Sequence, residues 1–213
     1  MSRTAVATKQ VGLLHFPGIL HFIVILIIAA IETVGLIIWL GLHTGADVIS
    51  VLDPLLAFLQ QQQTMLQIGG TTFAGIILGI FLLVEHIITQ VEQTGRLSVR
   101  EFVQIFVFSA IEVVIWIVWL LLIPVNGIVA FLFFFGSLFV EHQIADNVKK
   151  GLGFLHFSSL GSRVFQGLII VTLAEVVGAV IWVGAIPTVS LAALAVGSVV
   201  EHYVARNVAQ IRE

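Results

Sequence analysis

Glutamate and histidine stand next to each other at three places in the sequence, and each place lies inside a long apolar stretch. The three pairs are Glu85-His86, Glu141-His142 and Glu201-His202. Three further glutamates lie in other apolar stretches, each seven residues before a tryptophan: Glu32 before Trp39, Glu112 before Trp119 and Glu175 before Trp182. A charge at the centre of a membrane helix costs at least ~2.5–3.5 kcal/mol on insertion scales, so such acids should face a protein interior and have partners there.

Carboxylates and imidazoles supply the oxygen and nitrogen donors that transition metals bind in proteins. The chain has no cysteine, which excludes thiolate ligands, thioether-linked haem and disulfide bonds. A donor set of nitrogen and oxygen favours iron, manganese or zinc, leaves copper as an alternative, and disfavours calcium and magnesium because of the imidazoles. The predicted metal ligands are the nine members of the two sets: His86, His142, His202, Glu85, Glu141, Glu201, Glu32, Glu112 and Glu175.

Two geometries are open for this metal centre. In one, the three histidines bind an ion on a common axis and the glutamates lie behind them; in the other, the glutamates bridge a cluster. A ferritin-type dinuclear site is not implied, because those bundles use Glu-x-x-His on one helix face, whereas here Glu and His are adjacent.

We expect the nine residues to lie at about one depth and call them the Glu/His layer. Two further interpretations of this layer need no metal centre. If the helices pair as helical hairpins, Glu–His hydrogen bonds would hold the two helices of each hairpin together. Each bond would contribute about 0.6–2 kcal/mol. Alternatively, the histidines would be axial ligands of a haem, which is disfavoured because three histidines at one depth would crowd a single macrocycle.

Composition places these residues in a membrane. The 213 residues are 59% apolar, with a mean hydropathy of +1.15 and 10% charged side chains, against roughly 25% charged residues in ordinary soluble domains. This excludes a soluble protein and makes membrane lipid the expected surroundings. No basic stripe points to nucleic acid. A homo-oligomer and a subunit of a larger membrane complex are both compatible with this composition.

Six apolar stretches are long enough to cross ~30 Å of hydrocarbon at ~1.5 Å per residue, at about 18–42, 72–91, 99–123, 127–148, 162–184 and 188–209. Turn-forming residues such as Asn126-Gly127 separate them. Ser98 and Glu101 form a predicted capping box before the third stretch. We therefore predict an all-α integral membrane protein of six transmembrane helices in a single domain, residues 1–213.

The two sets of glutamates indicate an internal repeat. The first, third and fifth stretches carry the Glu-to-Trp spacing, and the second, fourth and sixth carry the Glu-His pair. We interpret this as three tandem copies of a two-helix hairpin, at about 12–92, 95–150 and 151–212, with pseudo-threefold symmetry about the membrane normal. The tryptophans are predicted to form an outer aromatic belt, with the wall of the site as the alternative.

The basic residues predict the orientation. All nine lysines and arginines flank one side of the predicted bundle, so this side and both chain termini are predicted to face the cytoplasm of a multi-pass cell-membrane protein. The long loop 43–71 lies on the other side. It contains Asp53-Pro54, an apolar run and four glutamines, which predicts an interfacial amphipathic helix at about 53–66.

The favoured function is a polytopic membrane metalloprotein whose buried centre does redox or hydrolytic chemistry, with enzymatic and non-enzymatic uses both open. A transporter or channel for a divalent cation or protons, using the same layer, is the first alternative. A haem-binding subunit, or a structural subunit held by Glu–His hydrogen bonds, is the second. Apolar residues above and below the layer predict a closed site, which favours the metal centre over transport.

Overall fold

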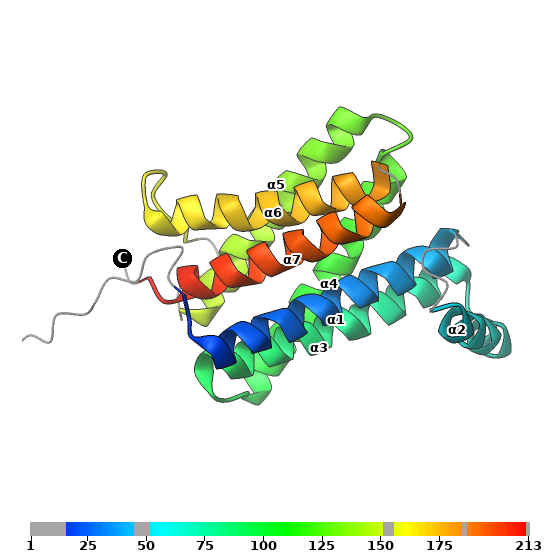
Figure 1. Ribbon diagram of the computed structural model, residues 1–213, viewed down its shortest axis with the longest axis horizontal. Coiled ribbons are helices and arrows are strands. Elements are labelled where there is room, and N and C mark those ends of the chain that lie inside the picture. The colour runs from blue at the N-terminus through cyan, green and yellow to red at the C-terminus, as the bar shows by residue number, and fades with distance from the viewer. Residues whose placement is uncertain (1–15, 45–51, 151–155, 185–186, 212–213) are drawn as a thin grey trace, which may run out of the picture.

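The computed structural model describes residues 16–44, 52–150, 156–184 and 187–211. These residues form seven α-helices and no strand, which confirms the all-α class: α1 Ile19–Thr44, α2 Asp53–Leu66, α3 Gly70–Thr94, α4 Val99–Leu122, α5 Gly127–Lys149, α6 Arg163–Gly184 and α7 Pro187–Ala209. The six long helices lie along one another in a bundle, and α2 lies at one end of it (Figure 1).

Five of the helices are long and apolar enough to cross a membrane: Ile19–His43, Gly70–Thr94, Val99–Leu122, Gly127–Val148 and Arg163–Gly184. The sixth predicted span corresponds to α7, which has 23 residues. It is not among these five, so a sixth span stays a prediction. With 14 residues, α2 is too short to span, and its position at an interface stays a prediction. The described residues thus form a membrane-embedded helical protein with five clear spans.

Capping chemistry fixes the ends of the helices that carry the site. The Ser98 side chain accepts from the Glu101 backbone N–H, and the Glu101 side chain accepts from the Ser98 N–H, which confirms the predicted capping box. Asn126 opens α5 by accepting from two backbone N–H groups of its first turn. Gly95, with φ 71°, ends α3 in the left-handed region that favours glycine. These caps make the turns on either side of α4 short, so that α3, α4 and α5 pack as neighbours.

The six long helices contact one another in a closed ring that follows the order of the chain. α3 packs against α4, α4 against α5, α5 against α6 and α6 against α7, while α1 contacts both α3 and α7. The side chains that point into the ring are therefore shared among all three predicted hairpins.

The two ends of the bundle differ in charge. The turn between α3 and α4, the end of α5, the start of α6 and the end of α7 lie at the end opposite α2 (Figure 1). Arg96, Arg100, Lys150, Arg163 and Arg206 belong to this end, which we call the basic end. The predicted location of the two termini concerns residues 1–15 and 212–213, which lie outside the described residues.

Tryptophan rings fill the bundle interior between the glutamate layer and the end that bears α2. Trp39, Trp119 and Trp182 are only 0, 2 and 6% exposed, so the predicted outer aromatic belt is wrong, because the rings pack inside the bundle and do not face its surroundings. Seven residues are almost two helical turns, which puts each tryptophan on the same helix face as its buried glutamate. Trp119 stacks on Phe134 with 4.3 Å between ring centroids.

Candidate metal centre

The nine predicted ligands lie inside the ring of helices. Glu32, Glu85, Glu112, Glu141 and Glu175 are buried, with exposures between 3 and 7%. Glu201 is partly buried and His202 is buried, while the side chains of His86 and His142 are 16 and 14% exposed. The prediction that the intramembrane acids face the protein interior is therefore confirmed for five of the six glutamates.

Each histidine contacts the glutamate that precedes a tryptophan in the next hairpin along the ring. His86 Nε2 lies 3.8 Å from Glu112, and His142 Nε2 lies 3.5 Å from Glu175. His202 Nδ1 lies 3.6 Å from Glu32, which closes the cycle. These contacts connect α3 to α4, α5 to α6 and α7 to α1. The alternative in which Glu–His pairs join the two helices of each hairpin is therefore wrong for these three contacts, because neighbouring hairpins share the interior.

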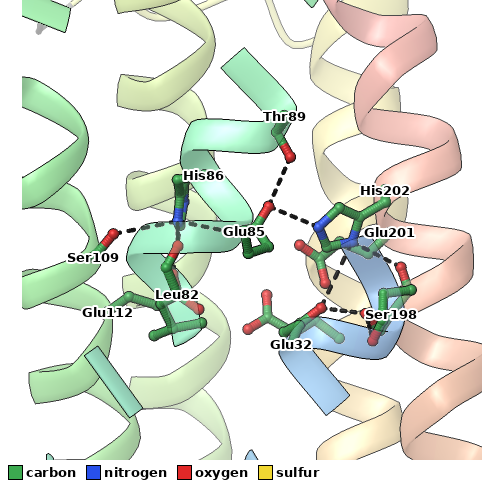
Figure 2. A network of polar contacts seen from close by, with 12 residues as sticks. Glu32, Leu82, Glu85, His86, Thr89, Ser109, Glu112, Ser198, Glu201 and His202 are labelled. Atoms are coloured by element: carbon green, nitrogen blue, oxygen red, sulfur yellow. Dashed lines mark hydrogen bonds and ion pairs between the residues drawn. The ribbon is translucent and has the colours of Figure 1, made fainter. Parts of the chain in front are cut away.

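A second set of contacts uses the glutamates of the Glu-His pairs. His202 Nε2 lies 2.9 Å from Glu85 Oε1, a hydrogen bond between α7 and α3 (Figure 2). His142 Nε2 lies 3.6 Å from Glu201, which connects α5 to α7. Adjacent residues on a helix project ~100° apart, so the Glu and the His of one pair can contact two different helices. Together the two sets join all six long helices into one polar network.

Hydroxyl groups that the sequence patterns did not predict contact this network. Ser109 Oγ lies 3.4 Å from His86 Nδ1, and Thr172 Oγ1 lies 3.1 Å from His142 Nδ1. Both hydroxyls stand three residues before the buried glutamate of their own helix, a spacing that could have revealed them. Ser198 donates to Glu32, and Thr89 donates to Glu85 Oε1 (Figure 2). Such partners hold ligand side chains in place around metal sites.

Two groups of three side chains bring ligand atoms within 4.8 Å of one another, and they share Glu201: Glu32, Glu201 and His202 form one, and His142, Glu175 and Glu201 form the other. Among the described residues, neither group contains two histidines. This matches the glutamate-bridged geometry rather than a three-histidine site on an axis. The other four predicted ligands belong to neither group: His86, Glu85, Glu112 and Glu141. Glu141 Oε2 lies 3.7 Å from His142 Nε2, and Glu85 Oε2 lies 2.8 Å from His86 Nδ1, so these residues adjoin the two groups.

Carboxylate oxygens without a hydrogen-bond partner in the described part of the chain occur in the second group and beside it. Neither side-chain oxygen of Glu175, which is 3% exposed, has a hydrogen-bond partner among the described residues, and the same holds for Oε1 of Glu141. A buried acceptor left unsatisfied costs about 1–3 kcal/mol, and more when it is charged. Carboxylate and imidazole ligands without sulfur suit iron, manganese or zinc. The residues present therefore fit a transition-metal ion.

The interior beyond the layer is polar toward the basic end, and there the prediction of apolar residues on both sides is wrong. Gln90, Gln143, Asn147 and Asn207 are between 0 and 5% exposed. A cavity of about 30 Å³ reaches His86 between α3, α4 and α5, with Gln90, Glu101 and Gln104 in its lining. This volume holds about two water molecules. Toward α2 the prediction holds, because the tryptophan core closes the layer.

Comparison of the chain with protein-family models, with curated proteins and with solved structures finds no match.

Proposed function

We propose that this protein is an integral membrane metalloprotein whose Glu/His layer binds two transition-metal ions bridged by Glu201. The observation that carries the proposal is the sharing of Glu201 by two buried three-ligand groups, one of which contains a glutamate with two unsatisfied oxygens. A divalent cation would neutralise two carboxylates and satisfy their lone pairs, and buried like charges need such compensation. Iron, manganese and zinc are the favoured ions.

The architecture that we propose around this centre has six membrane-spanning helices, with α7 as the sixth, in three hairpins related by pseudo-threefold symmetry. The cyclic His-to-Glu contacts between successive hairpins support this symmetry. Polar partners on neighbouring helices would offset the cost of the polar residues of α7, since His202 bonds to Glu85 and Arg206 pairs with Glu92. We propose that the basic end faces the cytoplasm, because positively charged loops are retained on that side.

The chain's own residues would hold the ions and restrict access to them. When bound, the metal would supply Lewis-acid or redox chemistry. His142 and Glu175 would hold one ion, His202 and Glu32 the other, and Glu201 would bridge them. The tryptophan core keeps water out from the side of α2, and the cavity next to His86 gives water-sized access from the basic end. These features fit a centre that reacts with small molecules or loses and gains ions from one side only.

Transport of a divalent cation or of protons is the second candidate, and the same cavity favours it. A transporter needs access from both sides of its binding site in turn. The packing of Trp39 against Trp116, with centroids 6.0 Å apart, closes the far side of the layer in this structure. A transport cycle would therefore require these rings to move apart, whereas a metal centre functions with them in place. This difference favours the metal centre.

We expect protein purified without chelator to contain about two transition-metal ions per chain, one for each ligand group. Elemental analysis of the purified protein, corrected for metal in a mock preparation, measures this number. Adding chelator should then lower the midpoint of thermal unfolding, because an ion that binds only the folded chain stabilises it by mass action. The proposal would be wrong if the chain carried no stoichiometric metal after supplementation with iron, manganese and zinc, and if chelator did not change its thermal stability.

A further inference from the structure

A groove of about 370 Å³ opens on the outer face of the bundle between α4 and α5. Its walls are apolar and include Ile111, Ile115 and Val140. Ile111 and Val140 are 46 and 44% exposed, so they face the surroundings of the bundle, which in a membrane are lipid. Two polar residues, Ser137 and Glu141, complete the lining. The groove therefore leads from the lipid side of the bundle to a carboxylate of the Glu/His layer.

Gly136 keeps this groove open. A Cβ atom built on Gly136 would meet no heavy atom of the described residues within 4 Å. Gly197 contrasts with it, because a Cβ there would lie 2.6 Å from the backbone oxygen of Ala174. Gly197 therefore permits the close packing of α6 and α7, whereas Gly136 serves no such close contact. At Gly136 the absence of a side chain leaves open space in the groove and is not needed for a close contact with another helix.

Glu141 connects the groove to the metal groups. It is 5% exposed, its Oε1 has no hydrogen-bond partner among the described residues, and its Oε2 lies 3.7 Å from His142 Nε2. An ionised carboxylate only accepts hydrogen bonds. A ligand in the groove that satisfied Glu141 would therefore have to bring a donor into surroundings that are otherwise apolar.

We propose that the groove between α4 and α5 binds a membrane-dissolved phenol-type compound, with its apolar body between the helices and its hydroxyl donating to Glu141. A phenolic hydroxyl is a stronger donor than an aliphatic one, and the volume falls in the range of small-molecule sites. The groove between α6 and α7 is larger, about 670 Å³, but its lining contains no ionisable side chain, so it offers no carboxylate to a hydroxyl donor. The proposal deepens the proposed function, because it names the substrate class of the metal centre beside Glu141.

Photolabelling in lipid nanodiscs tests this assignment with the full-length chain. The probe is 4-hexylphenol with a diazirine in its alkyl chain, and its methyl ether, which lacks the donor, is the chemical control. We expect labelled peptides from α4 and α5, with labelling at least about tenfold lower for the ether, as the loss of one hydrogen bond to a charged acceptor predicts. Gly136→Leu should abolish most of the labelling, because its Cβ has open space and the rest of the side chain would occupy the groove.

Ala192→Leu is the matched variant, since Ala192 lines the groove between α6 and α7 and its change should leave labelling of α4 and α5 as it was. Equal labelling by phenol and ether, or labelling spread evenly over the lipid-facing helices, would overturn the assignment. Repeating the experiment on chelator-treated protein separates the two proposals. Specific labelling of a chain that never binds metal would retain the groove and refute the metal centre, whereas a metal-loaded chain without specific labelling would refute the groove alone.

Discussion

Replacing Glu201 by glutamine is expected to remove metal from both ligand groups, with affinity falling at least ~10–100-fold, the range measured even for residues that only support metal ligands. Glu201 is the one side chain that the two groups share. An amide keeps the size of the side chain but lacks the charge that a bridging position between two cations requires. Elemental analysis and competition with a metal-binding dye would measure the loss.

Three further amide variants make this result specific. Glu175→Gln and Glu32→Gln each change one group, so each should lower the metal content by about one ion per chain and leave the other group loaded. Glu92→Gln changes a carboxylate that pairs with Arg206 outside both groups and should retain both ions. Equal losses in the Glu201 and Glu92 variants, or a Glu201 variant that keeps its metal, would contradict the bridged centre.

Gly197→Ala is expected to destabilise the bundle by about 1–3 kcal/mol, the usual cost of forcing extra volume into a packed interior. Its Cβ would lie 2.6 Å from the backbone oxygen of Ala174 and 3.2 Å from the Cα of Gly178, so α6 and α7 would have to move apart. Gly197 stands one turn before Glu201, and this movement should also lower the metal affinity. The midpoint of unfolding in mixed detergent micelles measures the stability.

Gly136→Ala is the control for that change, because its Cβ has open space. Alanine is favoured over glycine in a helix interior by about 0.8–1 kcal/mol, so this variant should be as stable as the unchanged chain or slightly more so. If the two alanine variants unfolded at the same midpoint, the close approach of α6 and α7 would not be the reason that Gly197 is a glycine.

Much of the fold follows from local features of the sequence. Apolar stretches of spanning length predict the helices, and the Ser98–Glu101 capping box and Asn126 predict where two of them begin, since these signals act through neighbouring backbone groups. The burial of the glutamates is also predictable, because a carboxylate in lipid is costly. The tryptophan positions could have been predicted from the same facts, since a residue seven positions after a buried glutamate lies on the same face.

The sequence alone could not predict which glutamate contacts which histidine within the layer. Which hairpin supplies the partner of each histidine depends on the order of helices around the ring and on the rotation of each helix about its axis. A rotation of one residue, ~100°, would exchange the contacts of Glu201 and His202 while leaving every sequence pattern intact. The sharing of Glu201 by two groups and the polar interior toward the basic end both depend on this rotation. They are properties of the packed bundle and not of any one helix.

Anomalous diffraction at the zinc absorption edge from crystals loaded with zinc would locate the bound ions. We predict two peaks inside the bundle, one beside His142 and Glu175 and one beside His202 and Glu32, both in reach of Glu201 at the ~2.0–2.2 Å typical of zinc–nitrogen and zinc–oxygen bonds. A single peak equidistant from His86, His142 and His202 would contradict the bridged centre. Peaks confined to carboxylates outside the layer would contradict the metalloprotein itself.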